Sequence, residues 1–544
     1  MPQTHEVTNQ APPLTGHDVA ADATLIEGLH RQGAGWSEDS LHTLGTLAGT
    51  EHAQELGRLA NENEPVLRTH DRYGNRIDEV EFHPAWHELM DTAVSHGLHA
   101  APWRDDRPGA HVARAAKLYV WGQVEAGHIC PVSMTYAVVP ALRANPALAA
   151  AYEPLLAARE YDFGLRAPAG KRGLIAGMSM TEKQGGSDVR SNTTRAVPAG
   201  GEAGTYTLTG HKWFTSAPMS DLFLTLAQAP GGLSCFLLPR VLPDGTRNRI
   251  QLQRLKDKLG NRSNASAEIE YDGALGYLVG EEGRGVRTII DMVNLTRLDC
   301  VLGTATAMRA GLIRAVHHTA HRSAFGAPLI DQPLMRNVLS DLAVESEAAT
   351  TVAFRLAGAT DRAARGDAAE ESFRRLALAV TKYWVCKRGP VHAAEALECL
   401  GGNGYIEESG MPRLYREAPL LSVWEGSGNV SALDALRAMA RQPDSVEAFF
   451  AEIDLAAGAD RRLDASVAEL KKELGDLTDL EFRTRRIVES MALVLQGSLL
   501  VRYGSPAADA FCASRLGGDH GRAFGTLPAG TDTAPLIDRA RHLL

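Results

Sequence analysis

Glu425 is the residue of this 544-residue chain best suited by its neighbours to act as a general base. It lies between Trp424 and Gly426, so an aromatic ring can shield the carboxylate while the glycine leaves it room to move. Removal from water raises the pKa of a carboxyl group towards the range in which it accepts a proton. The same pattern also fits a loop between helices with an exposed glutamate, and both interpretations stay open at this point.

Two glycine-rich segments could bring the backbone close to a bulky ligand. The first is Gly401, Gly402 and Gly404, in which the absence of a Cβ permits close approach. The second follows Met180 and Thr181, where Gly185, Gly186 and Ser187 offer N–H groups and a hydroxyl to a phosphate or a polar ring edge. Such a loop is a weak signal alone, and the pair of segments is more specific.

Composition narrows the class of protein. The formal charge of −10 argues against a surface coated with positive charge for nucleic acid, although a local basic patch stays possible. We find no apolar run long enough for a transmembrane helix and no secretory signal at the N-terminus. The six cysteines have no CxxC spacing, which predicts a reduced, cytoplasmic protein without a disulfide framework or a metal site.

The order of helical and strand-like patterns predicts a mainly α protein with a small central antiparallel β-domain, a barrel or a sandwich. We predict an N-terminal arm and helical domain at 1–177, the β-domain at 178–284, a helical bundle at 285–440 and a C-terminal helical domain at 441–544. The expected helices include 41–62, a long one at 286–323, 334–365, and 373–400 with a break near Gly389 and Pro390.

The chain resembles the acyl-CoA dehydrogenase family of flavoproteins. The resemblance is carried by three motifs: Thr181-Glu182 with Gly186-Ser187-Asp188; Arg322-Ser323-Ala324-Phe325-Gly326; and Glu398, Gly401, Gly402, Gly404, Tyr405, Glu408, Arg413 and Glu417. Members of this family place a β-domain between two helical domains and bind FAD in the seam. The resemblance therefore implies the fold expected above, FAD as cofactor, and a homotetramer whose subunits share it.

The resemblance also implies roles for individual residues. Glu425 would be the catalytic base, and Arg297 could steady it; a helix-surface salt bridge is the alternative role for Arg297. Phe214 stands where the family usually has a tryptophan against the flavin, and Pro333 stands where it usually has a glutamine, with Gln332 one residue earlier. The cofactor-binding candidates are Met180, Thr181, Gly186, Ser187, Phe214, Thr215, Ser216, Arg322, Phe325, Gly401, Gly402, Gly404, Trp424, Ser427 and Asn429.

One branch of the family is most similar, a group of flavoproteins of the bacterial adaptive response to alkylating agents. The similarity lies in the arm at 4–14, the tripeptide 424–426, the run at 258–266 and the extra C-terminal region. It implies that the C-terminal region binds double-stranded DNA through phosphates, with Arg483, Arg485 and Arg486 as candidates. The alternative is a solvated charged face that helps tetramer assembly.

Three functions follow as hypotheses. The first is an FAD- and DNA-binding protein that protects DNA from alkylation and has at most weak dehydrogenase activity, because Trp424 narrows the acyl pocket. The second is a metabolic acyl-CoA dehydrogenase for short or branched chains. The third is a redox-silent DNA-binding scaffold in which FAD only stabilises the tetramer.

Overall fold

The computed structural model describes residues 4–200 and 203–541. The first three residues of the predicted arm, residues 201–202 of the predicted β-domain and the last three of the chain lie outside the described residues. The chain forms two compact units, one of residues 1–51, 108–123 and 300–544, and one of residues 52–107 and 124–299. The predicted boundaries at 177, 284 and 440 stay predictions.

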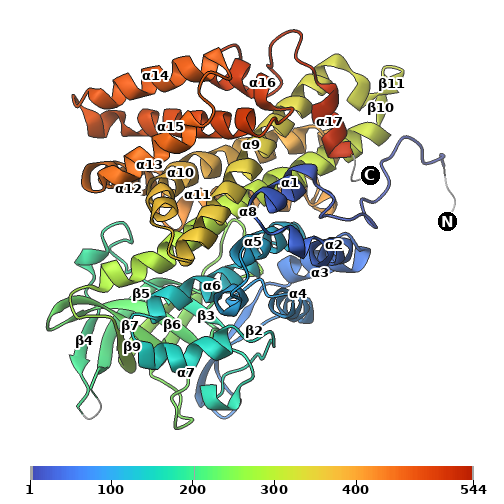
Figure 1. Cartoon of the computed structure of the whole chain (residues 1–544). Helices are drawn as coiled ribbons and strands as arrows, with labels where there is room; N and C mark the ends of the chain where they lie inside the picture. The colour runs from blue at the N-terminus through green and yellow to red at the C-terminus, as the bar shows by residue number, and fades with distance from the viewer. Residues whose placement is uncertain (1–3, 201–202, 542–544) are drawn as a thin grey trace. The chain divides into compact units, whose positions relative to one another are not determined.

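A seven-stranded sheet forms the centre of the second unit (Figure 1). The pairings β3–β6, β6–β7, β7–β9, β9–β5 and β5–β3 close a ring, while β8 extends it from β9 and β4 bridges β5 and β6. The β3–β6 and β4–β6 pairs are parallel, so the prediction of an antiparallel barrel is correct except at these two pairs. The strands are β3 Ala176–Ser179, β4 Arg195–Pro198, β5 Thr205–Ser216, β6 Leu222–Ala229, β7 Gly232–Pro239, β8 Ile250–Leu255 and β9 Ser266–Val279.

The helices of the second unit lie in the region predicted to be helical, 1–177, where a hairpin was missed. They are α3 Glu51–Glu62, α4 Pro84–Ser95, α6 Ile129–Leu142 and α7 Pro146–Leu156, the last with a proline in its first turn. The strands β1 Val66–His70 and β2 Arg76–Glu81 pair antiparallel in a region predicted to be helical. Their turn, around Gly74 at positive φ, is the signal that the prediction overlooked.

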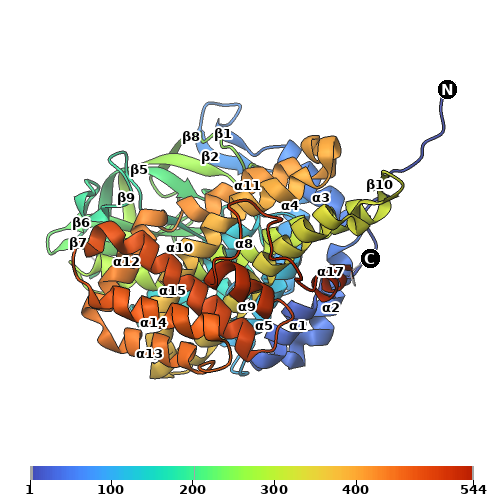
Figure 2. The ribbon, with the colours of Figure 1, turned by 90° about the horizontal axis from the view of Figure 1, so that it is seen from above.

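The first unit is almost entirely helical, and its C-terminal helices stack on the bundle (Figures 1 and 2). A continuous core joins α8 and α9 to α11, α15 and α17 through residues such as Leu312, Leu339, Met411, Leu500 and Leu536. Its helices are α1 Ala23–Arg31, α2 Glu38–Ala48, α5 Ala110–Trp121, the part of α8 (Gly285–His321) from residue 300, α9 Pro333–Ala364, α10 Ala368–Glu398, α11 Met411–Val423, α12 Gly428–Arg441, α13 Pro443–Asp454, α14 Arg461–Gly475, α15 Leu480–Arg502, α16 Ala508–Phe511 and α17 Ala534–Arg541.

Two predicted helix boundaries were wrong. The expected helix at 41–62 is broken into α2 and α3 at Gly49, where a side chain would collide with the carbonyl oxygen of His17 at 1.7 Å. Conversely, α10 continues through Gly389 and Pro390, where a break was predicted. About half of the residues of α10 are buried, so tertiary packing outweighs the hydrogen bond that Pro390 cannot make.

Short connections of the first unit hold several candidate residues. The two-stranded hairpin of β10 Ser323–Ala324 and β11 Ala327–Pro328 presents Phe325, and short 3₁₀ segments at Gly401–Tyr405 and Glu407–Ser409 lead into α11. Glu425 lies in the turn between α11 and α12. Within the described residues, none of the helices has the length and apolar character needed to cross a membrane. All six cysteines are buried free thiols.

Candidate functional site

A buried lysine holds the backbone of the turn that carries Glu425. Lys382 of α10 is 1% exposed, and its ammonium donates to the carbonyl oxygen of Trp424 at 2.9 Å and to that of Gly426. Glu425, between these carbonyls, has φ +57°, a left-handed conformation that a non-glycine residue adopts only when its surroundings impose it. The turn is therefore a fixed part of the structure and not a loose loop between helices.

Peptide geometry sets the direction of the N–H next to the candidate base. In a trans peptide the C=O and the N–H point in opposite directions. Because the Trp424 carbonyl points to Lys382, the N–H of Glu425 points away from the buried ammonium. The Trp424 indole N–H is buried and has no hydrogen-bond partner among the described residues.

The start of α12 forms a cationic corner directly after this turn. The hydroxyl of Ser427 makes no capping hydrogen bond to the described backbone, and Asn429 is exposed. A Cβ on Gly428 would come within 2.6 Å of Cε of Lys387, so the Lys387 side chain packs directly on the first residue of α12. A helix N-terminus beside a lysine favours an anion.

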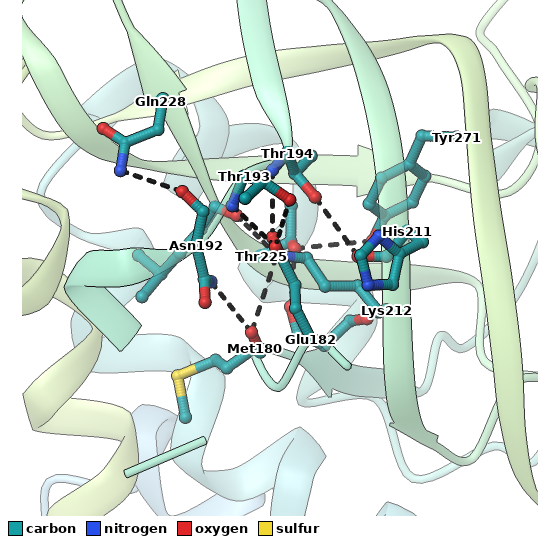
Figure 3. A network of polar contacts seen from close by, with 12 residues as sticks. Met180, Glu182, Asn192, Thr193, Thr194, His211, Lys212, Thr225, Gln228 and Tyr271 are labelled. Atoms are coloured by element: carbon teal, nitrogen blue, oxygen red, sulfur yellow. Dashed lines mark hydrogen bonds and ion pairs between the residues drawn. The ribbon is translucent and has the colours of Figure 1, made fainter. Parts of the chain in front are cut away.

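In the second unit, the backbone of Met180 and Thr181 rests on a buried ion pair (Figure 3). Lys212 of β5 contacts Glu182 at 2.9 Å, and both side chains are fully buried. The ammonium also donates to the carbonyl oxygen of Leu226 at 2.7 Å and lies 3.5 Å from that of Met180. Trp213 donates its backbone N–H to the carbonyl oxygen of Thr181 at 2.8 Å.

The Glu182 carboxylate is saturated with donors, as Figure 3 shows. Besides Lys212, it accepts from the backbone N–H groups of Thr193 at 2.6 Å and Thr194 at 3.1 Å, and from the Thr193 hydroxyl at 2.9 Å. Burial opposes its charge, but Lys212 and these donors hold the pKa of Glu182 down at about 2. The pair is thus ionised at neutral pH and positions the segment 180–182.

The remaining cofactor-binding candidates of the β-domain differ in how far they are buried. Phe214 is 48% exposed and stacks near Nζ of Lys256, 4.7 Å from its ring centre, so it offers an aromatic wall. Thr215 points inward, fully buried, and shares a 2.7 Å hydrogen bond with Ser179. Ser216 and Thr181 are partly buried, and Gly186 and Ser187 are exposed.

The tight packing of Gly186 and Gly404 explains why each is glycine. A Cβ on Gly186 would lie 2.4 Å from the Thr181 hydroxyl, and one on Gly404 would lie 2.1 Å from the Leu397 carbonyl oxygen. Gly401 and Gly402 are different, because both are exposed and no described atom lies within 4 Å of a Cβ built there. Gly401 also has φ +58°. These two glycines leave an open stretch of backbone at the surface.

The other catalytic candidate and the hairpin candidates lie on or beside α8. Arg297 belongs to the second unit and is buried, at 5% exposed, so it is not a helix-surface residue; its action on Glu425 stays a prediction. Arg322 and Phe325 belong to the first unit, and Phe325 is completely exposed. Gln332, the displaced glutamine, donates to the Ala324 carbonyl oxygen at 2.8 Å and so holds the hairpin.

The three arginines proposed for DNA have different partners in the fold. Arg483 donates to the Thr478 carbonyl oxygen at 2.9 Å, so it braces the loop before α15. Arg486 is exposed and lies 3.3 Å from Glu473, which Arg483 also approaches. Arg485 bonds to the hydroxyl of Tyr383 in α10 at 3.1 Å. DNA contact by these residues stays a prediction, and Arg486 is the most available of the three.

Family models match most of the chain. Residues 9–163 match the adaptive response protein AidB N-terminal domain, residues 177–274 the acyl-CoA dehydrogenase middle domain, and residues 283–440 the acyl-CoA dehydrogenase C-terminal domain. The chain is 48% identical over 521 residues to the putative acyl-CoA dehydrogenase AidB of Escherichia coli (strain K12), covering 94% of this chain and 95% of the relative. The chain belongs to the acyl-CoA dehydrogenase family.

Solved structures agree with this family fold. ACDH-11 of Caenorhabditis elegans, solved in complex with C11-CoA, matches with a TM-score of 0.85 at 27% identity, covering 94% of each chain. An acyl-CoA dehydrogenase from Bacillus anthracis, complexed with FAD, matches with a TM-score of 0.69 at 16% identity, covering 99% of this chain and 94% of that one. The predicted family and fold class are confirmed, and the predicted cofactor is the one which that acyl-CoA dehydrogenase carries.

Sequence reasoning missed Lys382, Lys212 and Lys387 as parts of these sites. Lys382 offered a signal, because it is a lone charge in the largely apolar run 376–386 of a predicted helix. A lysine in such a run is buried only with compensating oxygens. Its partners are backbone carbonyls, which no side-chain motif reveals.

Proposed function

We propose that this protein is an AidB-like FAD flavoprotein of the alkylation response, acting in the cytoplasm as a homotetramer. It binds double-stranded DNA, protects it from alkylating agents, and has at most weak acyl-CoA dehydrogenase activity. The proposal is supported by the extent of the similarity to AidB, which covers nearly all of both chains. The turn clamped by Lys382 is the observation that supports a catalytic role for Glu425.

The residues present fit FAD. Phe214 offers an exposed aromatic face to a ring system, and the backbone of 180–181 is held rigidly by the Glu182–Lys212 pair. The start of α12, with Ser427 and Lys387, suits an anionic group such as a pyrophosphate. FAD, when bound, would supply the acceptor for a hydride.

The chain's own contribution to such chemistry would be proton removal and charge stabilisation. Glu425 would take a proton from the carbon next to a substrate carbonyl, as a base needs to be held within reach of that proton. The N–H of Glu425, directed away from Lys382, would donate to the carbonyl oxygen on which negative charge develops. Trp424 would limit the size of the group that reaches this position.

A metabolic acyl-CoA dehydrogenase is the second candidate. It is favoured by one observation, that a structural neighbour with a TM-score of 0.85 was solved with a C11-CoA. Anaerobic mixing of the purified flavoprotein with short, branched and C11 acyl-CoAs separates the two candidates, because flavin reduction bleaches its visible absorbance. We expect slow bleaching that Glu425→Gln abolishes. Turnover as fast as that of a metabolic dehydrogenase would decide for the second candidate.

The DNA-binding part of the proposal is tested by salt titration. We expect affinity for double-stranded DNA to fall steeply with salt, since phosphate contacts release counterions. Changing Arg483, Arg485 and Arg486 together to Ala should make the slope shallower. The absence of binding even at low salt would exclude both the protective protein and the redox-silent scaffold.

A further inference from the structure

The exposed Phe325 is carried by a hairpin that cannot be stable alone. Phe325 and Gly326 have φ +54° and +84°, the two positive values of a type I′ turn, which is normally formed by Asn-Gly or similar residues. Each strand of the hairpin has two residues, and short isolated hairpins are marginal in water. A bulky residue at positive φ is strained, so neighbouring groups must impose this geometry.

The N-terminal arm provides these groups. The Asn9 side chain donates to the Ser323 carbonyl oxygen at 2.9 Å and accepts from the Ser323 N–H at 2.7 Å, so one amide satisfies both backbone groups of that residue. The backbone carbonyl oxygen of Asn9 also accepts from the Arg322 guanidinium at 2.7 Å. Asn9 therefore contacts Arg322 and Ser323, which lie one residue before the strained turn.

The arm is itself anchored on the same unit. His317 of α8 contacts the Pro12 carbonyl oxygen at 2.7 Å, and Gly16 donates its N–H to the Gly49 carbonyl oxygen at 2.6 Å. Figures 1 and 2 both show the arm passing beside the β10–β11 hairpin. On the other side, Gln332 bonds to Ala324. The hairpin is thus held between two amide side chains separated by more than three hundred residues of sequence.

Asn9 is suited to this position by its chemistry. Its own φ is +56°, and asparagine tolerates the left-handed region better than most residues. Asn9 is exposed, so its contribution lies in directed hydrogen bonds and not in burial of apolar surface. An interaction of this kind sets a geometry more than it stabilises the fold.

We propose that Asn9 is a positioning residue of the cofactor site: the N-terminal arm sets the orientation of Arg322 and Phe325, through which each subunit contacts the FAD of its neighbour. This inference rests on the proposed FAD-binding homotetramer, in which the family resemblance implies that Arg322 and Phe325 contact the FAD shared between subunits. It gives the arm a role at the cofactor, although the arm is remote in sequence from every FAD-binding candidate.

A double-mutant cycle on the full-length protein tests the inference. FAD affinity is measured by titrating the apoprotein and following flavin fluorescence, for Phe325→Ala, Asn9→Ala and the double variant. We expect each single change to weaken FAD binding by about tenfold, and the double variant to be no weaker than the weaker single variant, because coupled residues are not additive. Asn9→Asp keeps the acceptor for the Ser323 N–H but loses the donor, so it should weaken FAD binding about threefold.

Gln10→Ala is the matched control, because Gln10 is the exposed neighbour of Asn9 in the arm and should leave affinity unchanged. Gel filtration and the visible circular dichroism of the flavin accompany each variant. We expect the oligomer to be unchanged and the flavin signal of Asn9→Ala to resemble that of Phe325→Ala.

The outcomes distinguish the inferred role of Asn9 from the proposed sharing of FAD between subunits. If Phe325→Ala leaves FAD affinity unchanged, cofactor sharing through the hairpin is wrong, and the inference falls with it. If only Phe325→Ala weakens binding, cofactor sharing stands and the role of Asn9 is overturned. The role of Asn9 would also be overturned if the double variant weakened FAD binding by the product of the two single effects. Dissociation of the oligomer by Asn9→Ala alone would overturn it as well.

Discussion

Lys212 of the β-domain and Lys382 of the helical unit are both 1% exposed, yet their charges are compensated in different ways. Lys212 is paired with the buried carboxylate of Glu182. Lys382 has no carboxylate partner among the described residues and is solvated by the two carbonyl oxygens that flank Glu425. The paired lysine stabilises the segment 180–182, whereas the lysine held by carbonyls fixes the backbone of the turn that carries Glu425.

The largest loss of stability is expected when one partner of the Glu182–Lys212 ion pair loses its charge. Glu182→Gln leaves the Lys212 ammonium buried without its counter-charge, which should cost about 3–5 kcal/mol of unfolding free energy. Urea unfolding followed by circular dichroism measures it. The double change Glu182→Gln with Lys212→Met should recover much of the loss, since it removes the stranded charge. A double variant as unstable as the single one would contradict this account.

The same ion pair should make the stability of the protein depend on pH. The pKa of Glu182 is lowered from 4.5 to about 2, so its contribution to stability is complete above pH 4.5 and is lost as pH falls towards 2. The difference in urea midpoint between the wild type and Glu182→Gln should therefore shrink in this window. A difference that stayed constant down to pH 3 would mean that Glu182 has an ordinary pKa.

Lys382→Met should act on the turn and much less on the fold. The change removes two hydrogen bonds from a charged donor but also removes a buried charge, so we expect a net loss of about 1–2 kcal/mol. Hydrogen exchange of a peptide covering 424–431 should accelerate, while exchange in the barrel stays unchanged. Flavin reduction by acyl-CoA should become slower, whereas Glu425→Gln should abolish it. Unchanged exchange in this peptide would show that the clamp does not hold the turn.

The smallest change in the free energy of unfolding is expected at an exposed ion pair, in contrast to the two buried lysines. Arg486, with its side chain 76% exposed, pairs with Glu473, so Arg486→Ala should change stability by less than about 0.5 kcal/mol. If it contacts DNA, the salt slope should fall by about one. Arg483→Ala, which loses a bond to the Thr478 backbone, should cost more stability and serves as the contrast.

Much of the fold follows from local patterns. The long helices α8 and α9 and the C-terminal helices were predicted because their apolar periodicity runs over many residues. The continuity of α10 through Pro390 was not predicted, because it depends on packing against α9, α11, α12, α13 and α15. The β1–β2 hairpin was missed because its turn signal was given too little weight beside the helical segments around it.

The candidate site was predicted where side chains form motifs and missed where they act on backbone. Glu425 and the glycine segments stood out by type and spacing. Lys382 and Asn9 act on carbonyl and N–H groups that no motif specifies, and Asn9 reaches a partner 314 residues away. Burial also separates Thr215 from Phe214, its exposed neighbour on the same strand, and here the alternation of a strand would have been a usable signal.

All six cysteines are buried, which bears on the function proposed above, in which the protein would meet electrophiles. The thiolate is the form of cysteine that alkylating agents attack. Burial raises the pKa of Cys235, Cys399 and Cys512 to about 12 and also raises that of Cys386, so these side chains hold almost no thiolate at neutral pH. The fold thus keeps these four thiols protonated and buried, and under the function proposed above this would protect the chain itself from alkylating agents.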